Sequence, residues 1–203
     1  MKPVIDNLEE LKMRKTLSRL IPVALLAIGM QAHAQGASKA TVDVVGQGIG
    51  GAVVSEDGAT IIRTRGGVSA SLTMPTPLSG DYLYPGGVDA GHPEVFTGWL
   101  FVFNNPAACS GGVCDDDDLG ATPARGGAYN FAGHVVGGST LNLAGHASVG
   151  SQPFGGVPLD NPLGAEIHLA VAPHGVSLPE QMPGQIKTPI GDSSLWWLAI
   201  FVP

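Results

Sequence analysis

The chain contains 203 residues, of which 44% are apolar, and carries a formal net charge of −7 at pH 7. That apolar content is sufficient for a folded core, while 30 Gly and 16 Pro favour strands and turns over long helices. A net negative chain repels phosphate backbones, so nucleic acid is excluded from the expected partners.

The first 34 residues have the pattern of a secretory signal peptide. Basic residues between 14 and 19 precede an apolar stretch of 11 residues over 20–30, and Ala32-His33-Ala34 follows as a cleavage motif. The apolar stretch is too short to cross a bilayer as a helix. Because the acidic residues within 1–12 do not suit the basic start of a signal peptide, we predict that translation starts at Met13.

Cleavage between Ala34 and Gln35 leaves one expected domain over residues 35–203. This segment keeps 5 basic and 14 acidic side chains, a formal charge of −9. We expect it to be exported to the periplasm or the extracellular space, with no transmembrane anchor in the mature chain.

Six later segments are rich in β-branched and aromatic residues and end in Gly, Pro, Asn or Asp, which is typical of strands separated by turns. The expected fold is therefore a single all-β domain, an antiparallel β-sandwich or barrel with long Gly/Pro-rich loops. The expected loops are residues 73–93, with one short strand at 81–84, then 111–127 and 150–164. The six strand segments are residues 41–48, 51–65, 95–106, 127–149, 164–175 and 193–202.

Residues 46–51, Gly-Gln-Gly-Ile-Gly-Gly, match the G-x-G-x-x-G pattern of dinucleotide-binding sites. That pattern requires a following helix whose N-terminus meets the pyrophosphate, and the sequence that follows here is strand-like. We therefore interpret the segment as a Gly-rich bend between two strands.

Two strand-like runs flank Gly137-Gly138, which predicts a β-hairpin with His134 on one strand and His146 on the other. A two-residue turn directs the two imidazoles to opposite faces, and one extra turn residue separates them by roughly 13 Å along the ladder. Neither arrangement allows both to bind one metal ion, so we interpret them as polar residues of a half-exposed hairpin.

Cys109 and Cys114 are the only two cysteines, and four residues separate them. In an oxidising compartment such a pair is expected to form a local disulfide. Two cysteines alone do not make a zinc site, and the spacing is not that of a redox C-x-x-C motif. We expect the bond to make one turn rigid.

An acidic run, Asp115, Asp116, Asp117 and Asp118, follows the second cysteine directly. Carboxylate oxygens suit calcium, and a neighbouring disulfide reduces the ordering cost of binding. The run lacks the alternating spacing of known calcium loops, however, and clustered like charges are typical of a solvated loop. A calcium site and a solvated acidic loop both stay open.

Glu166, His168 and His174 are the residues that best suit a transition-metal site. On a strand, Glu166 and His168 share one face with Cα atoms about 6.6 Å apart, which suits metal chelation or a hydrogen-bonded acid–imidazole pair. If a turn brings His174 back toward His168, the set suits zinc, copper or iron. The alternative is a Glu–His pair that satisfies the backbone groups of a loop.

The segments WLFVFNNPAACSGGVCDDDDLG and NPLGAEIHLAVAPHG together resemble a family of uncharacterised exported bacterial proteins. The Glu-x-His strand is also distantly similar to CHRD domains, extracellular β-modules first noted in chordin. The family resemblance implies an exported β-domain and carries no established activity. Its pattern falls on Asn104, Asn105, Pro106, Cys109, Cys114, Glu166, His168, His174 and Gly175.

Two classes of function follow from these patterns. The first is a non-enzymatic module, structural or binding a ligand or ion, because the sequence contains no complete catalytic constellation. The second is a metal-dependent enzyme in which Glu166, His168 and His174 hold an ion that activates water or oxygen. The enzyme requires these three side chains to converge within about 4–5 Å of one another in a pocket.

Overall fold

The computed structural model describes residues 36–78, 82, 92–187 and 193–203. The predicted signal peptide over residues 1–34 lies outside this described part, as does the predicted strand at 81–84 apart from Tyr82. Within the described ranges, no helix is long and apolar enough to cross a membrane.

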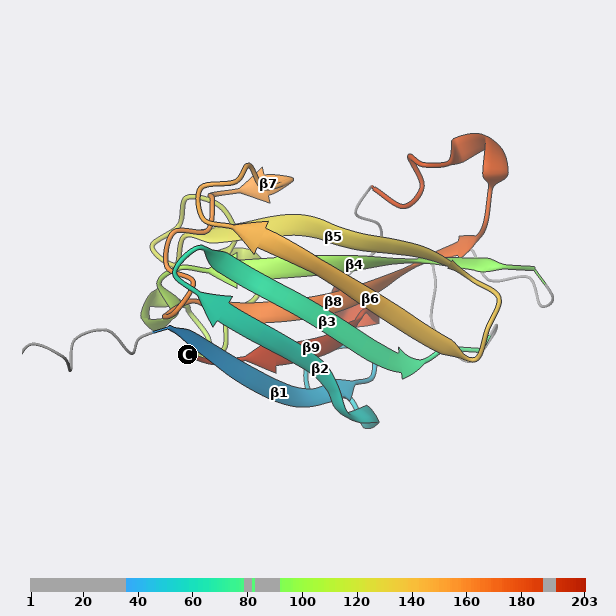
Figure 1. Ribbon diagram of the computed structural model, residues 1–203, viewed down its shortest axis with the longest axis horizontal. Helices are drawn as coiled ribbons and strands as arrows, with labels where there is room; N and C mark the ends of the chain where they lie inside the picture. Colours follow the sequence, from blue (N-terminus) through green and yellow to red (C-terminus); the bar gives the residue numbers. More distant parts are fainter. Residues whose placement is uncertain (1–35, 79–81, 83–91, 188–192) are drawn as a thin grey trace, which may run out of the picture. The chain divides into compact units, whose positions relative to one another are not determined.

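The described residues form one antiparallel sheet of nine strands, which confirms the predicted all-β fold (Figure 1). The order across the sheet is β6-β3-β2-β1-β9-β8-β4-β5-β7. Short 3-10 turns η1 (Pro106–Ala108), η2 (Asp116–Asp118), η3 (Pro179–Gln181) and η4 (Ser193–Leu195) lie in the connections. The strands are β1 (Ala37–Val45), β2 (Val53–Thr64), β3 (Gly67–Pro75), β4 (Glu94–Phe103), β5 (Gly126–Val136), β6 (Thr140–Ser148), β7 (Gly155–Gly156), β8 (Glu166–Val176) and β9 (Trp197–Phe201).

The sheet curls into a half-barrel, so that β5 and β6 contact each other although they lie near opposite ends of the strand order (Figure 1). The approach is close because Gly145 on β6 faces Phe131 on β5. A Cβ atom at Gly145 would lie 2.5 Å from the backbone oxygen of Phe131. Glycine is therefore required where the two ends of the sheet meet.

The predicted hairpin around Gly137-Gly138 is wrong. β5 pairs with β4 and β7, and β6 pairs with β3, so the two consecutive strands are not hydrogen-bonded to each other. His134 lies opposite Phe96, and His146 lies opposite Ser69, whose hydroxyl bonds to its Nδ1 at 3.0 Å. Packing the two strands across a curled sheet buries the same alternating apolar residues that a hairpin would bury.

Strand β3 (Gly67–Pro75) was not among the predicted strands, and its end lies in the loop predicted over residues 73–93. Its alternation is regular, with Val68, Ala70, Leu72 and Met74 buried between exposed neighbours. Small Ser and Ala residues reduce the β-propensity of this segment. The alternation of buried and exposed positions was therefore the only sequence pattern that indicated a strand here.

The central strands β4, β8 and β9 are covered on both faces. Their inward side chains, such as Leu100, Leu169 and Phe201, belong to the main core inside the curl. Their outward side chains form a second cluster with Trp99, Ala170, Ala172, Trp196 and Leu198. The cover over this outer face consists of loops, and the candidate site lies between them.

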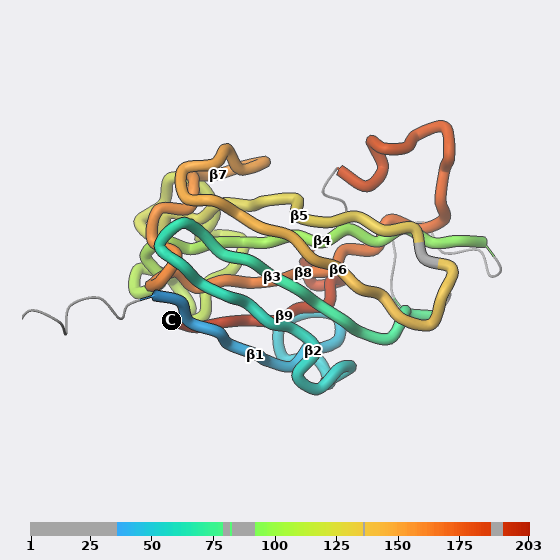
Figure 2. The backbone as a smooth tube through the Cα atoms, viewed as in Figure 1, coloured from blue at the N-terminus to red at the C-terminus, as the bar shows by residue number. Residues whose placement is uncertain are grey.

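The long connections over residues 104–125 and 149–165 gather at one end of the sheet, and residues 177–187 lie at the other end (Figure 2). Asn104, at the end of β4, ties the two loops together because its side chain bonds to the backbone of Arg125, Pro158 and Asp160. Arg125 and Asp160 form an ion pair across the same two loops. These bonds hold together the two loops at the end of the sheet where the disulfide loop lies.

Candidate functional site

A pocket of about 600 Å³ opens on the outer face of β4, β8 and β9. Its floor is mainly apolar, with Phe101, Phe103, Trp196 and Leu198. Three loop segments form its walls: the turn between β1 and β2, the disulfide loop, and η4. The polar lining consists of Gln47, Asp115, Asp116, Asp117, His168, Ser193 and Ser194.

The first wall is the glycine-rich segment 46–51, which forms a turn between β1 and β2 as predicted. The Gly48 amide donates to the carbonyl of Trp196 at 2.9 Å, and the Gln47 side-chain amide donates to the carbonyl of Leu195 at 2.6 Å. Gly48 has a φ of 83°, a backbone conformation that favours glycine. Its hydrogen bond to Trp196 holds the turn next to the end of η4.

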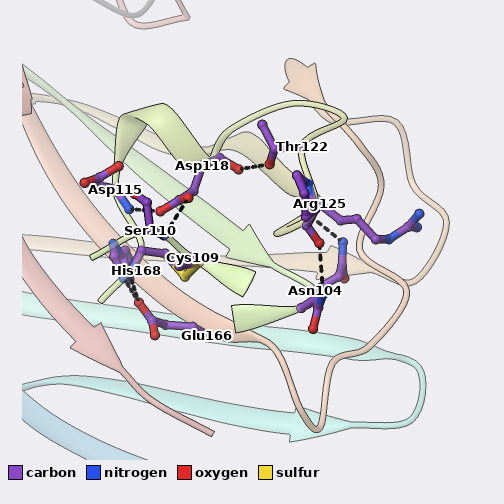
Figure 3. Close-up of a disulfide and its surroundings, with 12 residues drawn as sticks. Asn104, Cys109, Ser110, Asp115, Asp118, Thr122, Arg125, Glu166 and His168 are labelled. Atoms are coloured by element: carbon purple, nitrogen blue, oxygen red, sulfur yellow. Dashed lines mark hydrogen bonds and ion pairs between the residues drawn. A yellow bond between two sulfur atoms is a disulfide. The ribbon is translucent and has the colours of Figure 1, made fainter. Parts of the chain in front are cut away.

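Glu166 and His168 lie on the outer face of β8, two residues apart, as the spacing predicted. The Oε1 atom of Glu166 accepts a hydrogen bond from His168 Nε2 at 2.7 Å and another from the Cys114 backbone N–H at 2.8 Å. Glu166 is 2% exposed and His168 is 5% exposed. Figure 3 shows the pair beside the disulfide loop, which therefore fixes the carboxylate and, through it, the imidazole.

The hydrogen bonds to Glu166 determine its ionisation. Burial alone would raise the pKa of this carboxyl, but the hydrogen bonds from His168 and from the Cys114 N–H lower the pKa below its ordinary value. An ionised Glu166 accepts the hydrogen bond that His168 Nε2–H donates, which leaves Nδ1 as the ring nitrogen available to a ligand. Nδ1 of His168 has no hydrogen-bond partner among the described residues, and His168 lines the pocket.

The predicted local disulfide is confirmed between Cys109 and Cys114, whose Cα atoms lie 5.1 Å apart. Asp118 is buried beside it and accepts hydrogen bonds from the backbone N–H groups of Ser110 and Asp115 (Figure 3). The two sulfur atoms lie close to a carboxylate oxygen of Asp118, as metal ligands would. Because the sulfurs are bonded to each other, they are not thiolates that bind a metal.

The four acidic side chains predicted as a calcium loop have different partners. Asp115 and Asp118 form a capping box on η2, and Asp116 accepts a hydrogen bond from the Ser193 hydroxyl at 2.6 Å. In the part of the chain that the structure describes, no three of these carboxylates have oxygens within 4.8 Å of one another. Asp115, Asp116 and Asp117 instead form an acidic wall of the pocket.

His174 is not brought together with Glu166 and His168. It lies six residues beyond His168 on the same strand, roughly 20 Å away at about 3.3 Å per residue, because β8 continues through Val176 instead of turning at Pro173. Its Nε2 is hydrogen-bonded to the Thr97 hydroxyl at 2.9 Å. The structure therefore brings together two of the three predicted ligands and places the third elsewhere.

A second pocket of about 540 Å³ continues the first along the outer face. The two pockets share Phe101, Asp116, Ser193 and Trp196, so together they form one groove, which we call the outer groove. Its aromatic rings are in contact: Phe101 stacks on Trp196 with centroids 5.9 Å apart, and Trp99 meets the edge of Phe154 at 5.3 Å. Phe154 is 59% exposed, so the groove has an apolar rim open to solvent.

Comparison of the chain with protein-family models, with curated proteins and with solved structures gives no match.

Sequence reasoning did not identify Phe101, Trp196 or Ser193 as site residues. Residues 99–103 and 195–201 are apolar on both strand faces, which correctly indicated central strands. The sequence pattern does not show whether a neighbouring element or a ligand covers the second face. The loops that frame the groove come from residues 47–49, 114–117 and 193–194, and their meeting depends on the tertiary fold.

Proposed function

We propose that the mature domain is an exported module that binds a small amphipathic ligand in the outer groove. The observation that carries this proposal is the buried imidazole of His168, which bonds to Glu166 through Nε2 and lines a pocket with aromatic walls. Ligand sites are typically apolar hollows with a few fixed polar groups that orient the ligand. The outer groove has this composition.

Export is supported by the signal-like N-terminal sequence and by the local disulfide, which suits an oxidising compartment. The resemblance to exported bacterial β-proteins supports the same location. A binding role is favoured over a metal-dependent enzyme because His174 lies far along β8 and bonds to Thr97.

The proposal is tested with the neutral dye Nile red, whose emission increases in apolar sites, added to the domain over residues 35–203. We expect saturable binding that Phe154→Ser weakens about threefold to tenfold, because Phe154 contributes exposed aromatic surface at the rim of the groove. The matched control is Leu178→Ser, since Leu178 is a partly exposed apolar residue at the opposite end of the sheet. Equal weakening by both variants, or no saturable binding, contradicts a specific site.

A further inference from the structure

We propose that the ligand of the outer groove is an organic amine cation, with its ammonium group between His168 and the acidic wall and its apolar part on Phe101 and Trp196. This inference rests on the proposed function and names the chemical class of its ligand.

The side chains that line the groove give it a negative charge. Asp115, Asp116 and Asp117 line the first pocket, and none of the described residues that line either pocket is Lys or Arg. Asp116 and Asp117 are exposed at the mouth, and the Asp117 carboxylate is not used to cap η2. Such a wall attracts cations and repels carboxylate or phosphate ligands.

The His168 imidazole offers a hydrogen-bonding group to a ligand in the pocket. His168 donates through Nε2 to Glu166, so in the neutral ring the other nitrogen, Nδ1, is an acceptor that has no donor among the described residues. His168 is 5% exposed and lines the pocket, so a ligand that enters the pocket can reach the ring while bulk solvent has little access to it. An ammonium group supplies the donors that both Nδ1 and the carboxylates require.

The aromatic side chains of the groove can contact both a cation and an apolar group. Phe101 and Trp196 stack at 18°, and Phe103 lies against the His168 ring with centroids 5.1 Å apart. Ring faces attract a cation within about 6 Å and pack equally well against a carbon skeleton. The second pocket, with Trp99 and Phe154, provides room for an apolar group that extends away from the ammonium.

Three probes share a phenylpropyl group and differ in the charge of their polar group: 3-phenylpropylammonium, 3-phenyl-1-propanol and 3-phenylpropanoate. Comparing their affinities separates the effect of charge from that of shape. Each is titrated into the ¹⁵N-labelled domain, with the indole N–H signals of Trp99 and Trp196 as reporters in the groove. Trp197 packs inside the curl and is the internal control. We expect the ammonium to bind about tenfold more tightly than the alcohol, with no saturation by the carboxylate.

Isosteric variants identify the source of the preference. The double variant Asp116→Asn, Asp117→Asn removes two charges while leaving oxygen acceptors in place. It should reduce ammonium affinity about tenfold and change alcohol affinity less than about twofold. Glu56→Gln removes an exposed charge on β2, outside the groove, and should change neither affinity. His168→Gln, checked for folding by thermal unfolding, should also weaken ammonium binding.

The outcomes distinguish this inference from the proposed function. If the alcohol binds as tightly as the ammonium, or if the double Asn variant leaves the preference intact, the amine assignment is overturned while the groove remains a binding site. If none of the three probes shifts the Trp99 or Trp196 signals, both the amine assignment and the proposed site are overturned.

Discussion

His174 is a buried imidazole on β8 that is hydrogen-bonded to the Thr97 hydroxyl, whose oxygen also accepts a hydrogen bond from the Trp99 indole N–H at 3.0 Å. Burial disfavours the charged imidazolium form of this ring. Burial lowers the pKa of His174 from 6.5 to about 4.

The lowered pKa predicts a pH-dependent stability. The unfolded chain binds a proton at His174 below about pH 6.5, whereas the folded chain does so only near pH 4, so stability is complete above this window and falls as the pH falls through it. Between pH 7 and pH 5 the free energy of unfolding should decrease by about 2 kcal/mol from this residue. Urea unfolding at several pH values measures the slope.

The matched variants for this measurement are His174→Gln and His134→Gln. His174→Gln should flatten the pH slope even if it lowers stability at pH 7, whereas His134 is exposed and its variant should retain the wild-type slope. An unchanged slope in His174→Gln would show that another group controls the pH response.

At the scale of elements, the contact between β5 and β6 depends on one small residue. Gly145→Ala would place a Cβ 2.5 Å from the Phe131 backbone oxygen, so one of the two strands must move. We expect a loss of about 1–3 kcal/mol in the free energy of unfolding, measured by chemical denaturation. Gly137→Ala is the control, since its added Cβ has no atom within 4 Å and should change stability by less than about 0.5 kcal/mol. Equal effects would contradict the close packing of the two strands.

Some elements were predictable because a local spacing determines them. The four-residue gap between Cys109 and Cys114 suffices for a local disulfide, and the single residue between Glu166 and His168 places both on one strand face. Other features depend on distant residues. The Cys114 N–H that binds Glu166 is 52 positions away in the sequence, and the separation of β5 from β6 reflects the curl of the whole sheet.

In the whole molecule, the curled sheet keeps its main core inside and carries a second buried apolar cluster on the outer face of β4, β8 and β9. Loops cover this face at its edges and leave the outer groove between them. The disulfide loop has two roles there, because it forms the acidic wall and its Cys114 N–H fixes Glu166 behind His168. The fold therefore places a rigid acid–imidazole pair beneath an aromatic groove.

A crystal structure of the domain over residues 35–203 with 3-phenylpropylammonium at saturating concentration would locate the ligand. We expect the phenyl ring against Phe101 and Trp196, with the ammonium nitrogen about 3 Å from Nδ1 of His168. Ligand density elsewhere on the molecule, or an outer groove filled by the protein's own side chains, would contradict this placement.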